Sequence, residues 1–505
     1  MRLKSQWLLL LAVFALSTGT QAAERLRVLT QALAPISGAE VMIGSAVNNP
    51  FAGNVLKTDA NGYISIPMEW KAALPVTVTA SGFIVTRFEG VQPQSVIFQV
   101  HELDPAALGE VSGETMGFQN IKKDGLVDFG LVFPTMNRRQ LMQFSVSDLV
   151  SPETDQIKVI TQKVDLPSNV TLPEQKETYV LPITLKKPNY RAYLKPDSSY
   201  TITAAHGQFP LKEVIGEMQN GKTFFDVMNY FTFIDFGQFD LAVQKSTIPN
   251  QNVSVSQNLI DSKVSYQAPA YNNDQVLLAA ALVEQNGAFY PTDLKRIDSA
   301  QKRDMTVPAL AKSLYVASVL MPKTQAAPFN AQMTDMLLAQ TQPVAHFFKS
   351  LTNELYSYMG FQPTTQDATT APAIPGITLS IQKAPVTVGA EFIGLTQPPT
   401  VAGGMLKLTV PTVPASVAPV ATYLVLSEIV KTVKGKYTTE KRTRLLEFFA
   451  ESWLDELALP DLSSIVIPGK TYRWEVLYLG RDKNTKAGNY FLDEITHVSR
   501  HAYDF

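Results

Sequence analysis

TDANGYISIP, residues 58–67, is the stretch that most clearly indicates how this chain folds. Polar residues crowd a turn in which Asp59 and Asn61 can hydrogen-bond their own backbone and Gly62 can adopt a positive φ. In the alternating segment that follows, Ile64 and Ile66 face one side, and the residues between them face the other. The stretch therefore predicts a tight turn that leads into a half-buried β-strand, with Ile64 in the core.

Further short alternating runs surround this turn. The sequence predicts strands at 26–31, 40–43, 62–67, 76–80, 83–88 and 95–100. Val76 and Val78 alternate with threonines, which is typical of a strand with one buried face. Ser81 and Gly82 mark the turn after that strand. The region is therefore expected to fold as a small antiparallel sandwich.

Three motifs in this region carry a family resemblance: PISGAEV at 35–41, TDANGYI at 58–64 and VTASGF at 78–83. Together they resemble the carboxypeptidase regulatory-like domain, a small transthyretin-like β-sandwich. The first and third motifs match in full. In the second, Ile64 stands where the family has an aromatic residue, and Tyr63 falls one place early. The resemblance implies a scaffold over residues 23–103, in which the turn residues are structural, and it implies no catalytic residue.

A second resemblance lies near the C-terminus, in VIPGKTYRWEV at 466–476. It resembles a strand of fibronectin type III domains, although Val466 and Lys470 depart from that pattern. In such sandwiches a tyrosine can return its hydroxyl to the chain at a corner. The resemblance implies this role for Tyr472, with Trp474 on the same face, in a β domain over residues 373–505. The stretch 431–462 is longer than the usual loops.

The middle of the chain is expected to contain a second sandwich at 104–235 and a mixed β/α region at 236–372. Predicted strands of the former are 126–133, 143–150, 157–164, 178–185, 190–194 and 200–205, with a proline-bounded connector at 166–173 and two short helices within 210–231. The latter has strands at 276–283 and 310–320, helical segments at 331–338 and 345–358, and a polar linker at 362–372. The predicted fold class is mainly β, with several tandem Ig-like or transthyretin-like sandwiches and a few short helices.

The first 22 residues are typical of a bacterial signal peptide. Arg2 and Lys4 precede an apolar run at 7–16, and small residues follow at 22–23. We expect cleavage after Ala22 or Ala23; a buried N-terminal helix is the alternative interpretation. The chain has no cysteine, which excludes disulfides, thiolate metal sites and a lipoprotein anchor. A periplasmic, outer-surface or extracellular location follows.

Charge and motif content narrow the function classes. The chain has 43 Lys and Arg against 45 Asp and Glu, with no basic block, so nucleic acid is a poor candidate partner. No nucleophile elbow, phosphate loop or dinucleotide fingerprint occurs. His497 and His501 could hold zinc on a helix, but their segment is typical of a strand, where they would lie about 13 Å apart. We expect them on a solvated strand face, and we expect no cofactor or metal.

An aromatic cluster around residues 224–239 has two interpretations. Phe224, Phe225, Tyr230 and Phe233 could form a ligand face for a sugar or an apolar molecule. Alternatively, the cluster seals the junction between the second and third domains. Helical spacing followed by alternation favours the seal.

These patterns predict an exported, non-catalytic, multidomain β protein of the bacterial envelope or exterior that binds a polysaccharide or an envelope protein. One alternative is a secreted glycan-acting hydrolase with its active site within 236–372. Another is a structural surface protein that assembles with its own copies through strand edges. The identity of the ligand, the oligomeric state and retention in the periplasm do not follow from the sequence.

Overall fold

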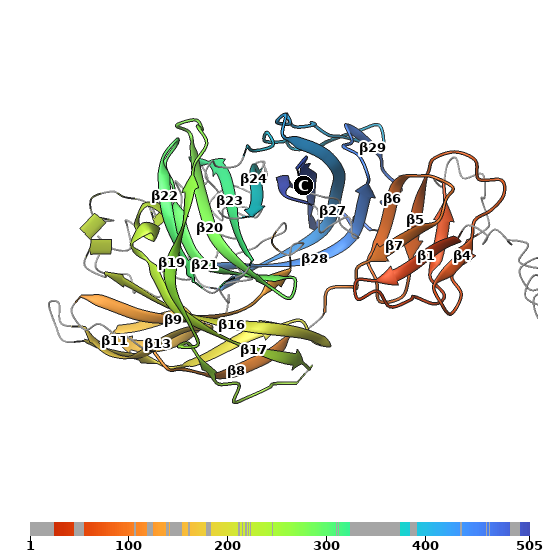
Figure 1. Cartoon of the computed structure of the whole chain (residues 1–505). Helices are drawn as coiled ribbons and strands as arrows, with labels where there is room; N and C mark the ends of the chain where they lie inside the picture. Colours follow the sequence, from red (N-terminus) through yellow and green to blue (C-terminus); the bar gives the residue numbers. More distant parts are fainter. Residues whose placement is uncertain are drawn as a thin grey trace, which may run out of the picture. The chain divides into compact units, whose positions relative to one another are not determined.

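The computed structural model describes residues 25–44, 55–105, 108–118, 125–137, 141, 154–159, 162–177, 183–210, 213–214, 216–217, 220, 222, 224–244, 246–309, 311, 313–323, 374–383, 391–434, 437–460, 462–463, 465–484 and 495–505. These residues form almost entirely β structure in several sheets (Figure 1). The predicted mainly-β fold class is therefore confirmed. The signal segment, the strand expected at 143–150, the helices expected at 331–338 and 345–358 and the linker at 362–372 lie outside the described residues.

The chain divides into two compact units. Unit 1 combines residues 1–103 with residues 444–451, and unit 2 combines residues 104–443 with residues 452–505. The long strand β28 (Tyr437–Ala450) thus contributes its second half to unit 1. The insert at 431–462, longer than the usual loops, thus contains this strand.

Unit 1 has strands β1 (Arg25–Thr30), β2 (Glu40–Ile43), β3 (Leu56–Lys57), β4 (Tyr63–Ser65), β5 (Leu74–Thr79), β6 (Val85–Val91) and β7 (Val96–Val100). One sheet has the order β4-β1-β7, and the other has the order β28-β6-β5-β2-β3. The pairs β1·β7 and β6·β28 are parallel. Alternate residues of both sheets, including Leu26, Val28, Val76, Val78 and Phe98, form one buried core. Unit 1 is therefore a sandwich.

The turn at 58–62 joins the first two motifs of the sequence. The Asp59 carboxylate accepts the backbone N–H groups of Asn61 and Tyr63, each at 2.8 Å. Gly62 has a φ of +76°, and Ile64 is buried in the core. The buried Thr58 hydroxyl donates to the Ile36 carbonyl at 2.6 Å and accepts the Ala39 N–H at 2.8 Å. This threonine explains physically why the two motifs occur together.

Unit 2 begins with β8 (Gly109–Met116), β9 (Leu126–Pro134), β10 (Met136–Asn137), β11 (Thr154–Val159), β12 (Gln162–Pro167), β13 (Val170–Glu177), β14 (Ile183–Lys187), β15 (Asn189–Leu194) and β16 (Ser198–Pro210). It continues with α4 (Phe224–Val227), the 3-10 helix η2 (Met228–Tyr230), β17 (Thr232–Val243), β18 (Val253–Ser254), β19 (Asn258–Gln267), β20 (Gln275–Gln285), β21 (Ala288–Arg296), β22 (Lys302–Pro308) and β23 (Leu314–Pro322). It ends with β24 (Ile374–Lys383), β25 (Thr400–Ala402), β26 (Met405–Lys407), β27 (Val417–Lys434), the first half of β28, β29 (Glu456–Ala458), β30 (Thr471–Asp482) and β31 (His497–Asp504).

Several sheets build unit 2. The order β14-β13-β9-β16-β17-β19-β22 forms one sheet, and the order β15-β8-β18 forms a smaller one. Val111, Val132, Tyr190, Ile202 and Val253 form a core between these two sheets. A larger sheet runs β10-β21-β20-β23-β24-β31-β30-β27-β28, and a further small sheet runs β25-β26-β29. A second core places side chains of β19 and β22 against those of β20 and β23.

Two predictions of secondary structure in unit 2 are wrong. The single strand expected at 157–164 is a hairpin, β11·β12, and β13 begins within the connector expected at 166–173. Prolines caused the second error. Pro167 ends β12, and Pro173 lies where the pairing of β13 with β14 shifts register between Leu172 and Gln175. Proline is tolerated at a bulge because no ladder N–H is needed there.

Candidate functional site

The aromatic residues proposed as a ligand face lie on α4, η2 and β17. The backbone of Phe224 and Phe225 is in α4, but their side chains lie outside the described part of the chain. Tyr230 is 38% exposed at the end of η2. Phe233 packs against a core formed by β9, β16, β17, β20 and β21 and contacts the ring of Phe129, with 6.1 Å between centroids. Phe233 is therefore half-buried against this core, whereas Tyr230 is exposed.

The residues of the fibronectin-like motif lie on β30. The Tyr472 hydroxyl accepts the Ile467 N–H at 2.7 Å and donates to the Ile465 carbonyl at 3.3 Å. The Tyr472 ring is buried, as is Trp474 two residues later. Tyr472 thus fastens the loop before β30 to the sheet. In unit 1, Gly82 occupies the turn between β5 and β6 with a φ of +85°.

The expected solvated position of His497 and His501 is wrong. Both lie on a strand, β31, as expected, but both are buried. Burial lowers the pKa of each imidazole to about 4. The His501 Nδ1–H donates to the Thr396 carbonyl at 3.0 Å. Alternation predicts one solvent-exposed face for this strand, whereas almost every residue of β31 is buried.

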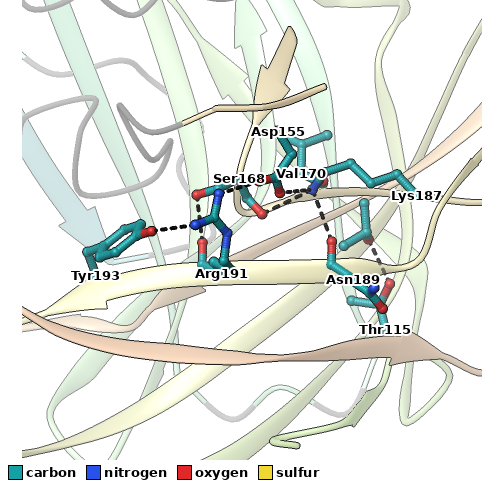
Figure 2. Close-up of polar contacts among 9 residues, drawn as sticks. Thr115, Asp155, Ser168, Val170, Lys187, Asn189, Arg191 and Tyr193 are labelled. Carbon is teal, nitrogen blue, oxygen red and sulfur yellow. Dashed lines mark hydrogen bonds and ion pairs between the residues drawn. The ribbon is translucent and has the colours of Figure 1, made fainter. Parts of the chain in front are cut away.

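A buried lysine joins the β11·β12 hairpin to β13 and β15 (Figure 2). The Lys187 ammonium donates to the backbone carbonyls of Ser168, Val170 and Asn189, at 3.1, 2.6 and 3.0 Å. It also forms an ion pair with Asp155 of β11 at 3.2 Å. Burial lowers the pKa of Lys187, and the neighbouring Asp155 opposes that shift. The ammonium has four acceptors, so it holds strands together rather than presenting a free amine.

Arg191 of β15 completes this polar cluster. Its guanidinium pairs with Asp155 and donates to the Tyr193 hydroxyl at 2.9 Å. Its backbone and Ser168 exchange two hydrogen bonds, each 2.9 Å long. The neighbouring Thr115 and Thr171 hydroxyls are 2.7 Å apart. Figure 2 shows these side chains converging from several strands on the segment at 168–170.

The constellation in the described chain that most resembles a catalytic one is Asp128, His206 and Asp235. The imidazole of His206 on β16 lies between the carboxylates of its two neighbouring strands, with Nε2 2.8 Å from Asp128 and Nδ1 3.2 Å from Asp235. Gln208 also donates to Asp128 at 2.6 Å. No sequence signal identified this group, because Asp235 and Asp128 are 29 and 78 residues from His206 and only the strand register brings them together.

This acid–histidine–acid group is closed to solvent. Asp128 and His206 are 0% exposed, and Asp235 is 2% exposed. The Gln175 side chain exchanges hydrogen bonds with the Asp128 backbone, and the Phe118 ring meets the imidazole edge-to-face at 4.9 Å. Burial alone would lower the pKa of His206, but the two carboxylates raise it. The group is therefore closed to solvent and joins three neighbouring strands through its hydrogen bonds.

A second set of buried charges lies on β30 and β31. Arg473 forms a bidentate pair with Asp504, with Nη2 2.9 Å from Oδ2. Glu475 pairs with both Arg500 and Arg442. Although burial opposes it, the charges of Arg442, Arg500 and Arg473 lower the pKa of Glu475 to about 2. Within the described residues, no group of His, Asp and Glu has the arrangement needed to hold a metal ion.

Comparison with known proteins identifies no family. No protein-family model and no curated protein matches the chain. Among solved structures, the Bacillus anthracis TIE protein is 8% identical at a TM-score of 0.14, and the match covers 59% of this chain and 44% of that chain. The Bacillus cereus major pilin subunit BcpA is 10% identical at a TM-score of 0.14, with 58% and 86% covered. A streptococcal ancillary pilin is 10% identical at a TM-score of 0.13, with 59% and 88% covered.

These similarities are too low to transfer a role or a site geometry. The chain also spans less than half the length of the TIE protein that it matches. Among the described residues, the structure contains no helix of the length and hydropathy needed to cross a membrane.

Proposed function

We propose that the chain is an exported, non-catalytic protein of the bacterial cell envelope or exterior, whose β-sandwich domains bind a polysaccharide or an envelope protein. The export signal predicted at residues 1–22 and the sandwich architecture support this role. Sandwich domains present sheet faces and loops on a rigid scaffold, which suits binding more than chemistry that needs an enclosed site.

The observation that carries the proposal is the enclosure of Asp128, His206 and Asp235. A general acid or base must come within hydrogen-bonding distance of the proton that it transfers. Here both imidazole nitrogens already face carboxylates, and all three residues are buried. The Lys187 ammonium, which could otherwise act as a nucleophile, likewise donates hydrogen bonds to three backbone carbonyls. The side chains of His206 and Lys187 therefore hold neighbouring strands together.

The test uses the purified chain from Ala23 to Phe505. It is incubated with immobilised polysaccharides and with solubilised envelope fractions, and bound and released material is measured over time. We expect saturable binding to one class of polysaccharide or to one envelope protein, with the ligand recovered intact. Shortening of a bound glycan would overturn the non-catalytic assignment. Self-association without any captured ligand would favour a purely structural role.

A further inference from the structure

The outer face of the β4-β1-β7 sheet in unit 1 has an unusual composition. Leu26, Val28 and Phe98 point into the core of the sandwich. Side chains alternate along strands, so the outward positions are Arg25, Arg27, Leu29, Tyr63, Ser65, Ile97 and Gln99, of which Leu29 is buried. Two of these are arginines, one is aromatic and none is acidic. Ile97 is 60% exposed, so this face is open to solvent.

The two arginines flank the tyrosine ring. The guanidinium carbon lies 4.8 Å from the Tyr63 centroid in Arg27 and 5.7 Å from it in Arg25. Tyr63 and Arg27 are directly paired across β4 and β1, and Ile97 of β7 is paired with Arg27 on the other side. Stacking on an aromatic ring holds a guanidinium in one orientation and leaves its edge N–H groups able to donate.

Neither arginine is neutralised in the described part of the chain. Arg27 Nε donates to the Asn61 carbonyl at 3.3 Å, and no ion pair joins Arg25 or Arg27 to a carboxylate there. The Asp59 carboxylate, in the adjacent turn, accepts two backbone N–H groups. A buried arginine such as Arg473, by contrast, has an acidic partner in Asp504. Two oriented positive charges without carboxylate partners therefore mark this face.

We propose that the outer face of the β4-β1-β7 sheet binds a carboxylate-bearing polysaccharide. Guanidinium groups match planar carboxylates with paired hydrogen bonds. The Ser65 and Gln99 side chains add neutral hydrogen-bonding groups, and Ile97 and the Tyr63 ring add apolar surface for the C–H faces of sugar rings. This inference rests on the proposed function, because it specifies the ligand class and the site.

The test is a binding titration of the Ala23–Phe505 chain with polygalacturonate, with neutral dextran and polyglutamate as comparison ligands. The variant Arg25→Gln/Arg27→Gln removes both charges and keeps polar side chains. We expect at least about tenfold weaker binding of polygalacturonate, the loss that follows from removing charge-assisted hydrogen bonds. We also expect Tyr63→Leu to weaken binding, and wild-type binding to decline with added salt.

The matched control is Lys57→Gln/Lys71→Gln. It removes two exposed positive charges of unit 1 that lie outside this face, on β3 and in the loop between β4 and β5. We expect the control to bind polygalacturonate as wild type does. Equal losses in the two double variants, or equal binding of polyglutamate, would overturn the proposal in favour of non-specific charge attraction. A lower melting temperature of the arginine variant, together with unchanged binding of polygalacturonate, would also overturn the proposal.

The outcomes separate this proposal from the broader function. Binding of dextran or of another neutral glycan that is insensitive to the arginine variant would overturn this site and its ligand class, while the proposed function would stand. Absence of binding to any polysaccharide or envelope protein would overturn both.

Discussion

At the scale of single residues, Gly62 tests how the turn at 58–62 is built. Its φ is +76°, and an added Cβ would lie 2.5 Å from the Val28 carbonyl oxygen. Gly82 has a similar φ of +85°, but an added Cβ there would meet no atom within 4 Å. Gly82→Ala should therefore destabilise unit 1 by about 1 kcal/mol through backbone strain alone. Gly62→Ala should cost clearly more, because β1 must also move.

The measurement is chemical denaturation of both variants, followed by a probe in unit 1 such as Trp70. Equal losses of unfolding free energy for the two alanine variants would show that β1 and the turn do not approach each other as closely as described. The comparison cancels the conformational effect of alanine on the unfolded chain, which is the same at both glycines.

Tyr472 offers a second residue-scale prediction. Tyr472→Phe removes a hydroxyl that serves the Ile467 N–H and the Ile465 carbonyl. Ile467 is 50% exposed, so water can take over part of the role of the hydroxyl, and we expect a loss of about 0.5–1.5 kcal/mol, the net contribution of a hydrogen bond, in thermal or chemical unfolding. Tyr230→Phe is the control because Tyr230 is 38% exposed. An unchanged stability of Tyr472→Phe would refute the role of the hydroxyl at this corner.

The lowered pKa values of His497 and His501 predict how the stability of the fold depends on pH. The folded chain lowers the pKa of both to about 4, from the ordinary value of 6.5. Below pH 6.5 the unfolded chain binds protons at these sites and the folded chain does not until about pH 4, so stability falls as the pH falls through this window. Shifts of this size are worth roughly 2–4 kcal/mol for each histidine.

The variant His501→Asn isolates one of these contributions. Its side-chain amide can still donate to the Thr396 carbonyl, but it does not titrate. We expect the loss of unfolding free energy between about pH 6.5 and about pH 4 to shrink by the contribution of His501, roughly 2–4 kcal/mol, whatever the stability of the variant at neutral pH. An unchanged acid loss would show that His501 is not buried in its neutral form.

At the scale of elements, Lys187 determines whether the β11·β12 hairpin stays docked. Lys187→Met removes one ammonium from three carbonyls and from Asp155. Asp155 keeps its partner Arg191, so the cost comes from the carbonyls that lose their donor, and a buried acceptor left without a partner costs about 1–3 kcal/mol. We expect faster hydrogen exchange across residues 154–167 and a lower global stability. The neighbouring Lys186→Met is a matched control.

Lys186 is on the same strand, but its ion pair with Glu174 is exposed to water. Exposed pairs contribute little to stability, so we expect no measurable change in exchange or unfolding for that variant. Similar effects of the two substitutions would mean that the hairpin is not held by the Lys187 ammonium.

At the scale of the whole molecule, the sequence predicted the turns and strands that are determined by residues adjacent in the chain. The turn at 58–62, strand β2 and the strand with Tyr472 follow from local alternation, glycine and turn chemistry. It could not predict the Asp128–His206–Asp235 group or the burial of His497, because those depend on which strands pair across long separations. It also missed that residues 444–450 complete unit 1, since a strand's alternation does not say which sheet it joins.

The completion of unit 1 by β28 leads to the last prediction. Residues 446–450 pair in parallel with β6, and the Phe449 ring contacts Phe88 in the core of unit 1. The buried Glu447 pairs with His101 at 2.5 Å. A fragment of residues 23–103 lacks these contacts and leaves the β6 edge unpaired. We therefore expect it to be less stable than the same fragment joined through a flexible Gly/Ser linker to residues 444–451.

The loss of one packed aromatic ring and one edge strand should lower the melting temperature of the shorter fragment by about 10 °C or more for a domain of this size. A third fragment carries the same linker and residues 444–451 in scrambled order, which controls for the added length. We expect it to melt like the fragment of 23–103 alone. Equal melting temperatures for all three fragments would show that unit 1 folds without β28. In that case the strand at 444–450 would be an addition to a complete sandwich rather than part of it.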